Sequence, residues 1–151
     1  MKRITLLFFI ICNFIFAFTG KVTKVADGDT ITVLANGKSV RIRFYGIDAP
    51  EKKQDYGIKS LDVLKKLLDG KTVEIEEKDK DQYGRVVGVV FLNGENINLK
   101  QVAEGNAWWY KQYAKRDNDL KKAEERAREK KLGLWKNQDA IAPWEFRRKN
   151  K

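Results

Sequence analysis

The sequence contains no histidine, one cysteine and two prolines among its 151 residues. The absence of histidine excludes Ser-His-Asp and Cys-His nucleophilic sites, histidine-ligated zinc and any reaction in which imidazole is the base. With Cys12 as the only cysteine, an internal disulfide and a thiolate metal cluster are also excluded. Acid–base chemistry must therefore fall to Asp, Glu, Lys, Arg or Tyr. Any metal site must be rich in oxygen ligands, which calcium, magnesium and manganese prefer.

Positive charge is what the chain has in excess. Its 31 Lys and Arg residues and 21 Asp and Glu residues give a net charge of +10. Such an excess favours a polyanionic partner, nucleic acid first and an anionic membrane surface second, although it also serves solubility. The length suits a single domain, and a hydrophobic content of 42% is enough for one core.

Residues 1–17 have the pattern of a secretory signal peptide. Two basic residues precede an apolar run that ends at Phe16, and Ala17 is a suitable small residue for a cleavage site. The run is shorter than the ~20 residues that span a bilayer. An uncleaved anchor and a lipoprotein attached at Cys12 are the alternatives. We predict a secreted or periplasmic monomer, residues 18–151, without stable membrane association after cleavage.

The first half of the remaining chain has the pattern of strands and one helix. Alternating β-branched residues predict a three-strand meander up to residue 45, with Asn36-Gly37 as a hairpin turn. A helix over 56–69 follows, and then a two-strand hairpin over 72–76 and 86–92. The apolar face of this helix is expected to contain Ile58, Leu61, Leu64 and Leu68. Meander, helix and hairpin together favour an OB-type Greek-key barrel of five strands.

The second half adds two helices, so we predict an α+β fold with about three. Asn98 is expected to cap the first of them, with Gln101 as its capping-box partner and Gly105 as its end. The second should begin at 117 or 118, run to 132 and bury Leu120, Ala123 and Ala127. The segment around Pro143 and Trp144 is expected to fold back onto the domain. The basic tail over 147–151 should be frayed.

An aromatic patch lies between these two helices. It consists of Trp108, Trp109, Tyr110 and Tyr113, with Lys111 among them. Aromatic faces with interleaved cations suit single-stranded nucleic acid, because bases stack on the rings and phosphates pair with the cations. Core packing of some of these rings is the alternative.

Charged side chains gather where the predicted strands end. Asp29 precedes one strand, Arg43 lies in the next, and Asp48 and Glu51 follow it, next to Pro50. Carboxylates could bind a hard divalent cation, and Arg43 and Arg85 could hold phosphate oxygens at two points each. These are the groups that phosphodiester hydrolysis requires. A metal-free network of salt bridges among the same residues is the alternative.

Four ordered motifs make the chain similar to the staphylococcal nuclease family. They are Asp27-Gly28-Asp29-Thr30, Arg43 through Asp48-Ala49-Pro50-Glu51, Asp81-Gln82-Tyr83-Gly84-Arg85 and Leu132-Gly133-Leu134-Trp135. The resemblance covers roughly residues 20–146. It implies a five-stranded OB barrel with three helices and calcium-dependent cleavage of DNA and RNA that leaves 3′-phosphate ends.

The resemblance also implies a role for each residue. The calcium ligands would be the carboxylates of Asp29 and Asp48 and the backbone carbonyl of Ala49. The phosphate ligands would be Arg43 and Arg85. Glu51 would position or deprotonate the attacking water, and Asp27 would orient the site from behind the ligands. The nucleic-acid contacts would include Tyr83, Tyr113 and Lys111.

Two departures from the family pattern concern affinity and not chemistry. The loop after Glu51 is shorter and lacks most of a lysine-rich turn, and Gln82 stands where a lysine would aid phosphate binding. We expect a preference for single strands. A non-catalytic OB-fold module that binds nucleic acid is the competing hypothesis, and a cationic membrane-surface protein is a weaker third.

Overall fold

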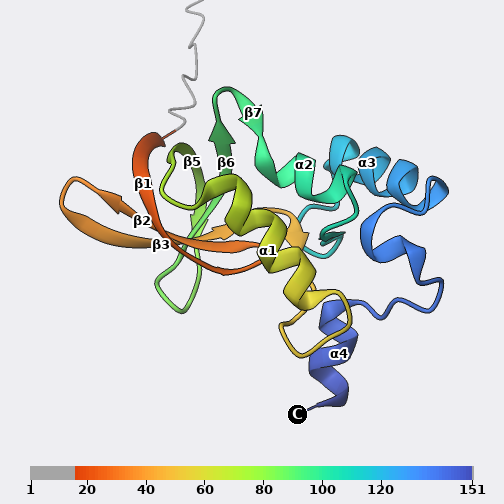
Figure 1. Cartoon of the computed structure of the whole chain (residues 1–151). Coiled ribbons are helices and arrows are strands. Elements are labelled where there is room, and N and C mark those ends of the chain that lie inside the picture. Colours follow the sequence, from red (N-terminus) through yellow and green to blue (C-terminus); the bar gives the residue numbers. More distant parts are fainter. Residues whose placement is uncertain (1–15, 151) are drawn as a thin grey trace, which may run out of the picture.

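The structure is a computed structural model that describes residues 16–150 (Figure 1). Within these residues, five strands form a closed, mixed barrel: β1 (Phe16–Asp27), β2 (Thr30–Ala35), β3 (Lys38–Phe44), β5 (Thr72–Lys80) and β6 (Val86–Leu92). Their order is β3-β2-β1-β5-β6, and a parallel pairing of β3 with β6 closes the ring. The predicted OB-type barrel and the α+β class are confirmed.

The first three strands form the predicted antiparallel meander. Asn36 and Gly37 have φ angles of 48° and 74°, as a two-residue hairpin turn requires. Inward-facing residues of β2 and β3 are at most 1% exposed: Ile31, Val33, Ile42 and Phe44. Pairing of Thr30 with Arg43 places the start of β2 beside the end of β3. Residues just outside these two strand ends therefore lie close together.

Three short strands complete the β-structure of the described part. β7 (Glu95–Asn96) extends the sheet beyond β6, and β4 (Ile47–Asp48) pairs with β8 (Trp108–Trp109) in a separate two-stranded sheet. The sequence predicted that Asp48 lies just past the end of a strand, close to a turn at Pro50. Its backbone is instead held by this pairing, which only the tertiary structure brings about.

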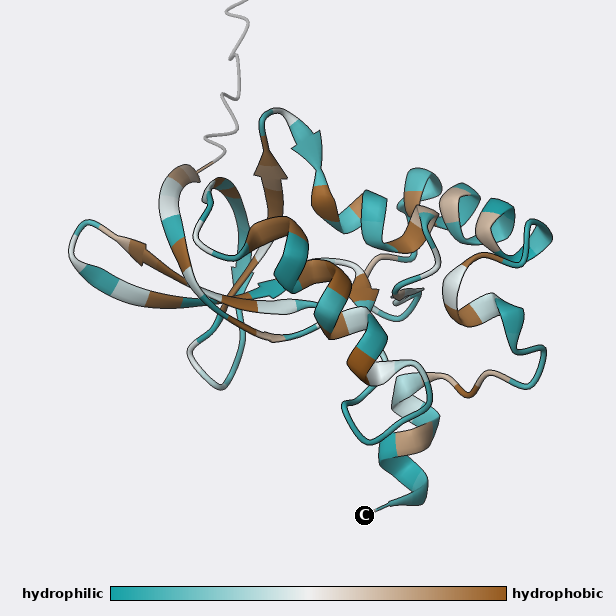
Figure 2. Ribbon diagram, viewed as in Figure 1, coloured by the Kyte–Doolittle hydropathy of each residue, from teal (hydrophilic) through white to brown (hydrophobic). Residues whose placement is uncertain are grey.

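The described residues contain four α-helices and one 3-10 helix, where about three helices were expected. They are α1 (Gly57–Leu68), α2 (Ile97–Ala103), α3 (Asn118–Glu129), η1 (Gly133–Lys136) and α4 (Pro143–Lys149). α3 begins after Asp117, whose side chain accepts from the N–H of Leu120. As predicted, α3 buries Leu120, Ala123 and Ala127, and the rest of its surface is hydrophilic (Figure 2).

Two details of the predicted helices are wrong. The buried face of α1 is shifted, because Ile58 is 53% exposed and Ser60 is buried instead. Asn98 is not a cap. Asn96 caps α2 by accepting from the N–H of Leu99, and Asn98 lies inside the fold with 2% exposure. It bonds both to the backbone of β6 and to the carbonyl of Tyr45.

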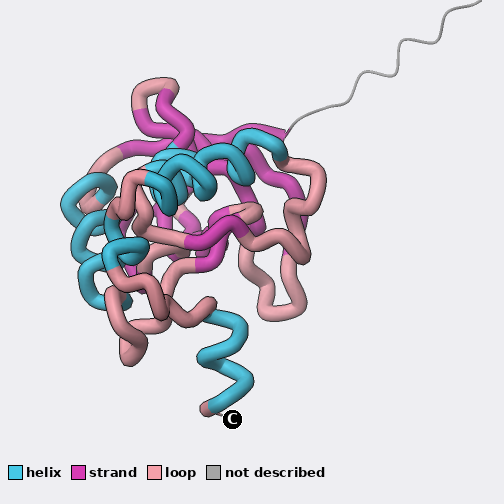
Figure 3. Tube along the Cα trace, turned by 90° about the vertical axis from the view of Figure 1, so that its right-hand side faces the viewer, coloured by secondary structure: helices cyan, strands magenta, loops and turns pink. Residues whose placement is uncertain are grey.

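The basic C-terminal segment is a helix and not a frayed tail. Residues Pro143–Lys149 form α4, which has Pro143 in its first turn and extends from the body of the domain (Figure 3). Trp144 anchors it, since its ring is stacked on that of Tyr110 at 5.2 Å and 5° and lies edge-on to Trp108 at 5.6 Å. The predicted return of this segment to the domain is confirmed.

The predicted signal peptide falls almost wholly outside the described residues. Phe16 and Ala17 are described, and they pair with Glu77 and Glu76 of β5 at the start of β1. No helix within residues 16–150 is both long enough and apolar enough to cross a membrane.

Candidate active site

One open cleft of about 770 Å³ gathers nearly all the residues predicted for the site. It lies where β1 turns into β2, beyond the end of β3, and between the β5–β6 loop and α4. The predicted residues that line it are Asp27, Asp29, Arg43, Asp48, Ala49, Glu51, Tyr83, Arg85 and Tyr113. Lys111 is exposed and is not among its lining residues. Arg147 also lines the cleft, and sequence reasoning did not assign it to the site.

The turn between β1 and β2 places Asp29 at the bottom of the cleft. Only glycine fits at position 28, because a Cβ there would lie 1.9 Å from Oγ of Ser60 and 2.7 Å from Cβ of Ala49. Its carbonyl accepts a hydrogen bond of 2.9 Å from the buried amide of Gln101 in α2. Asp29 itself is 5% exposed and accepts from the backbone N–H of Ala49 at 2.5 Å. This bond joins the two strand ends that the register brings together.

Arg43 bridges the two aspartates. Its Nη2 lies 2.9 Å from Oδ1 of Asp48, and its Nη1 lies 3.3 Å from Oδ2 of Asp29. The same Nη1 donates to the carbonyls of Phe44 and Ile47 at 3.0 and 2.8 Å. The guanidinium is therefore fixed in one orientation at the cleft surface, with 15% of the side chain exposed. Its planar fork is held for a two-point contact with an anion.

Two of the aspartates are held in unfavourable surroundings for a negative charge. Burial raises the pKa of Asp27 to about 7, and the neighbouring Asp29 adds to the rise. Burial also raises the pKa of Asp48 to about 6. This rise is larger than the lowering caused by the hydrogen bond from Arg147. Asp27 accepts a hydrogen bond of 3.1 Å from the backbone N–H of Asp29, so it supports the turn that carries this residue. These carboxylates would gain from a nearby cation.

Glu51 lies at the more exposed side of the cleft, directly after Pro50. Its side chain is 42% exposed, and its Oε1 is 2.8 Å from Nη1 of Arg147. Its backbone carbonyl accepts from the N–H of Gln54, which closes a tight turn before α1. The glutamate is thus positioned by a rigid turn but remains open to water.

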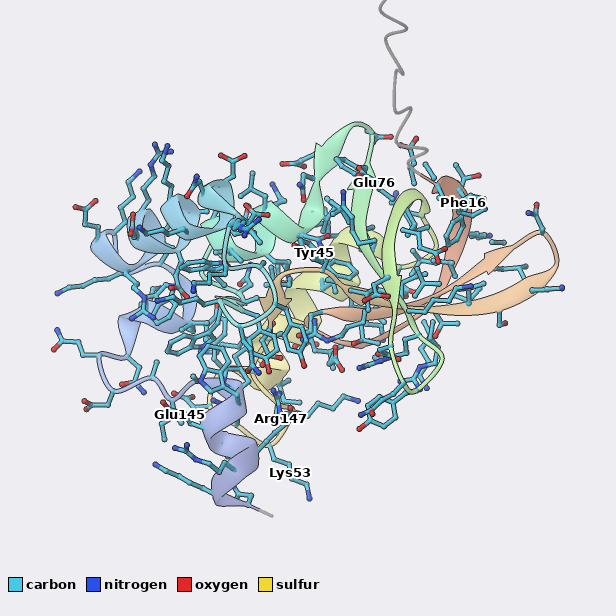
Figure 4. All side chains as sticks on the ribbon, turned by 180° about the vertical axis from the view of Figure 1, so that it is seen from behind. Phe16, Tyr45, Lys53, Glu76, Glu145 and Arg147 are labelled. Atoms are coloured by element: carbon cyan, nitrogen blue, oxygen red, sulfur yellow. The ribbon has the colours of Figure 1, made fainter. Side chains whose placement is uncertain are left out.

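Arg147 of α4 is the residue of the site that sequence reasoning missed. Its Nη2 is 2.8 Å from Oδ2 of Asp48, and its Nη1 is 3.3 Å from Oδ1 of the same carboxylate. Figure 4 shows Arg147 and Glu145 on opposite sides of α4. The signal available in the sequence was Pro143, which suits the first turn of a helix. That helix would have placed the basic residues on defined faces.

Arg85 directly precedes β6, the strand that pairs with β3 at Arg43 and Val87. Its Nε is 2.6 Å from Oδ2 of Asp81, and its backbone N–H donates to Oδ1 of the same side chain. The two hydrogen bonds from Arg85 lower the pKa of Asp81 against the opposing effect of burial. Asp81 therefore orients Arg85, a role that its place in the sequence motif did not reveal. Tyr83 is 73% exposed, and its ring lies 5.7 Å from the guanidinium of Arg85.

The aromatic patch is divided between core and cleft. Trp108 and Trp109 are 8% and 9% exposed and pack in the interior, so core packing explains them. Tyr113 is 67% exposed, and its ring is 4.8 Å from that of Tyr110. One face of Tyr110 is already covered by Trp144. Only Tyr113 of this patch has a ring that is free for stacking among the described residues.

The donor set at the cleft fits a hard divalent cation only in part. Asp29 and Asp48 offer carboxylate oxygens, and among the described residues no imidazole or thiolate ligand lines the cleft. Such a ligand set suits calcium or magnesium. Within residues 16–150, no group of three or more acidic, histidine or cysteine side chains has the arrangement of a complete metal site. Such an ion would have to complete its ligand shell with backbone oxygens, water or substrate.

Several known proteins are similar to this chain over most of its length. The family described as "Staphylococcal nuclease homologue" matches residues 41–137. An "Uncharacterized endonuclease" of Escherichia coli is 47% identical over 129 residues, which cover 85% of this chain and 84% of the relative. A "Micrococcal nuclease" of Shigella flexneri is 40% identical over 144 residues, with 89% and 83% covered. "Protein ParB" of Escherichia coli is 38% identical over 141 residues, with 87% and 80% covered. The chain belongs to the staphylococcal nuclease family.

Proposed function

We propose that this protein is a metal-dependent nuclease that hydrolyses phosphodiester bonds of DNA and RNA. Membership of a nuclease family makes the chain a hydrolase of the nuclease type. The observation that carries the proposal is the gathering of Arg43, Arg85 and Glu51 around two buried aspartates in one cleft. Calcium is the proposed ion, and the proposed products end in a 3′-phosphate.

The two arginines would act on the phosphate from neighbouring strands, because β3 and β6 pair at Arg43 and Val87 and Arg85 directly precedes β6. Arg43 is held by Asp29, Asp48 and two backbone carbonyls, and Arg85 is held by Asp81. Guanidinium groups fixed in this way stabilise the charge that develops on a pentacoordinate phosphorus without reorganising.

Glu51 would act on the attacking water, which it would orient or deprotonate. The oxygen of this water would attack phosphorus and lose a proton to Glu51 or to solvent. The bond from phosphorus to the 5′-oxygen would break, and the 5′-oxygen would leave as a hydroxyl after taking a proton from solvent. The new 3′-phosphate would remain on the upstream strand. Asp29, Asp48 and the carbonyl of Ala49 would hold the cation. The bound cation would offset phosphate charge and lower the pKa of coordinated water. Asp27 would keep Asp29 in place through the hydrogen bond to its backbone N–H.

We further propose that Tyr83 and Tyr113 contact the nucleotides, because both are exposed at the cleft. Exposed rings at a cationic cleft favour unpaired strands, whose bases are free to stack.

A secreted or periplasmic monomer remains our proposal for the state of the protein. The mass of the exported chain would locate the predicted cleavage after Ala17.

The deciding experiment measures degradation of denatured and duplex DNA by the purified full chain, with calcium, with magnesium and with a chelator. We expect cleavage with calcium, loss of cleavage with the chelator, and faster cleavage of the denatured substrate. End-labelling of the fragments would identify 3′-phosphates. Salt-sensitive DNA binding without cleavage under any condition would instead favour the non-catalytic binding module.

A further inference from the structure

The guanidinium of Arg147 is hydrogen-bonded to the acidic oxygens of the site. It contacts both oxygens of Asp48 and one oxygen of Glu51, at distances between 2.8 and 3.3 Å. Arg43 already uses Oδ1 of Asp48 from the other side. Asp48 is 2% exposed, so few of its lone pairs remain open to any other ligand.

The electrostatics of the cleft explain why a cation is held there. Six carboxylates and three arginines line the cleft, and two of these arginines, Arg43 and Arg147, are paired with Asp29, Asp48 or Glu51. A buried carboxylate without a partner is costly, and a planar guanidinium can satisfy two acceptors at once. Arg147 therefore offsets negative charge that Arg43 alone compensates only in part.

We propose that Arg147 is the internal counter-cation of this site: its guanidinium must leave Asp48 before a divalent cation can bind there, and it thereby sets the affinity of the site for metal. This inference rests on the proposed metal-dependent function. It assigns to α4, which lies outside residues 41–137 that define the family match, a direct part in the site.

The way in which α4 is anchored allows this exchange without unfolding. Pro143 is buried and Trp144 is stacked on Tyr110, so apolar contacts hold the first turn of the helix. Arg147 lies in the next turn, and 40% of its side chain is exposed. Rotation of that side chain into solvent breaks its ion pairs and leaves the aromatic anchor in place.

Competition for one carboxylate is a coupling between two ligands, and it is reciprocal. Removal of Arg147 should strengthen metal binding, and binding of metal should free Arg147.

The test compares the wild-type protein with Arg147→Gln, which removes the charge, and with Arg147→Lys, which keeps the charge but not the planar fork. Arg148→Gln is the matched control, because Arg148 is exposed and forms no ion pair within residues 16–150.

Calorimetry is carried out on all four proteins, and NMR on the wild type, with Arg147→Gln used to assign the resonance. Calorimetric titration with calcium gives the affinity, and we expect Arg147→Gln to bind about tenfold more tightly than wild type, within the usual range of such couplings. Arg147→Lys should be intermediate and Arg148→Gln unchanged. NMR gives the second readout through the Nε–Hε resonance of Arg147, identified by its loss in Arg147→Gln. Calcium should shift this resonance towards that of a solvent-exposed arginine.

The outcomes separate this inference from the proposed function. Equal calcium affinity in wild type and Arg147→Gln, or an Nε–Hε resonance unmoved by saturating calcium, would overturn the inference and leave the nuclease proposal intact. Weaker calcium binding in Arg147→Gln would also overturn it, since Arg147 would then support the metal site. Absence of calcium binding in all four proteins, with DNA cleavage retained in chelator, would overturn the metal dependence itself and with it this inference.

Discussion

Asp81 holds Arg85 through two contacts, a 2.6 Å ion pair to the side-chain Nε and a 3.0 Å hydrogen bond from the backbone N–H. The pair fixes one guanidinium at the cleft, at the start of the strand that adjoins β3. Arg43, in contrast, is held by the buried Asp29 and Asp48. The two arginines therefore differ in what their removal would do to the fold.

We predict that Arg85→Ala lowers kcat by about 10²- to 10³-fold, the usual cost of losing one group that stabilises a developing charge. The melting temperature should change little, because the side-chain contacts of Arg85 are with Asp81 and Tyr83, both on the loop before β6. Kinetics on denatured DNA and thermal unfolding would measure both. Arg41→Ala, an exposed change on the neighbouring strand, is the control. Near-normal turnover by Arg85→Ala would remove this residue from the mechanism.

Glu51→Gln should reduce the rate by at least about 10²-fold, because the amide can neither accept a proton nor attract the water as a carboxylate does. Its stability should stay close to that of wild type, since 42% of the side chain is exposed. Single-turnover cleavage in saturating calcium would isolate the chemical step. A variant that keeps most of its single-turnover rate would show that another group handles the water.

The pH dependence of stability provides a test of the buried acids that needs no substrate. The pKa of Asp27 is raised to about 7 in the folded protein from an ordinary value of 3.8, so the folded state binds a proton more tightly. Its contribution to stability is complete below about pH 4 and is lost as the pH rises through 7, by roughly 4 kcal/mol over the whole range.

Asp27→Asn should remove most of this loss, because the neutral amide can still accept from the N–H of Asp29 and does not ionise. Asp48, whose pKa is raised to about 6, would contribute the remaining slope. Urea unfolding between pH 4 and pH 8 in the presence of a chelator would give the two curves. Parallel curves for the variant and the wild type would contradict the assignment of the slope to Asp27.

Asn98 should be the more important of two neighbouring asparagines for stability. Its side chain accepts from the N–H of Val90 and donates to the carbonyls of Tyr45 and Gly88, all at 2.9 to 3.1 Å. Asn98→Ala would leave these buried groups unpaired, at about 2–4 kcal/mol, whereas Asn96→Ala would lose only a helix cap, at about 1 kcal/mol. Chemical unfolding of both variants would rank them, and equal losses would contradict this difference.

The barrel and the main polar residues of the site were predictable because the signals for them are local. Alternation in β2 and β3 and the Asn36-Gly37 turn depend on residues that are neighbours in the chain. The apolar stripe of α3, with Leu120, Ala123 and Ala127, depends on helical spacing alone. Asp29 and Asp48 were found because they lie beside the ends of predicted strands that had to meet, and Arg43 because it lies near the end of one of these strands.

Other features depend on partners that are distant in the sequence. Asn98 has the residue type and position of a helix cap, and only the approach of β6 and Tyr45 turns it inward. Trp108 and Trp109 have the composition of a stacking surface. Trp108, however, is buried in an apolar cluster that also contains Leu134 and Trp135. In both cases burial against another element decided between two roles that the local sequence allowed equally.

The sequence by itself determined the barrel, the excess of positive charge, the absence of histidine chemistry and the carboxylate and guanidinium groups of the cleft. Only the tertiary structure decided that Arg147 belongs to the same site. A basic segment near the chain end carries no local sign of its partner, since its contact with Asp48 spans 99 residues. That contact forms because Trp144 is stacked on Tyr110 and brings a cation to a buried carboxylate.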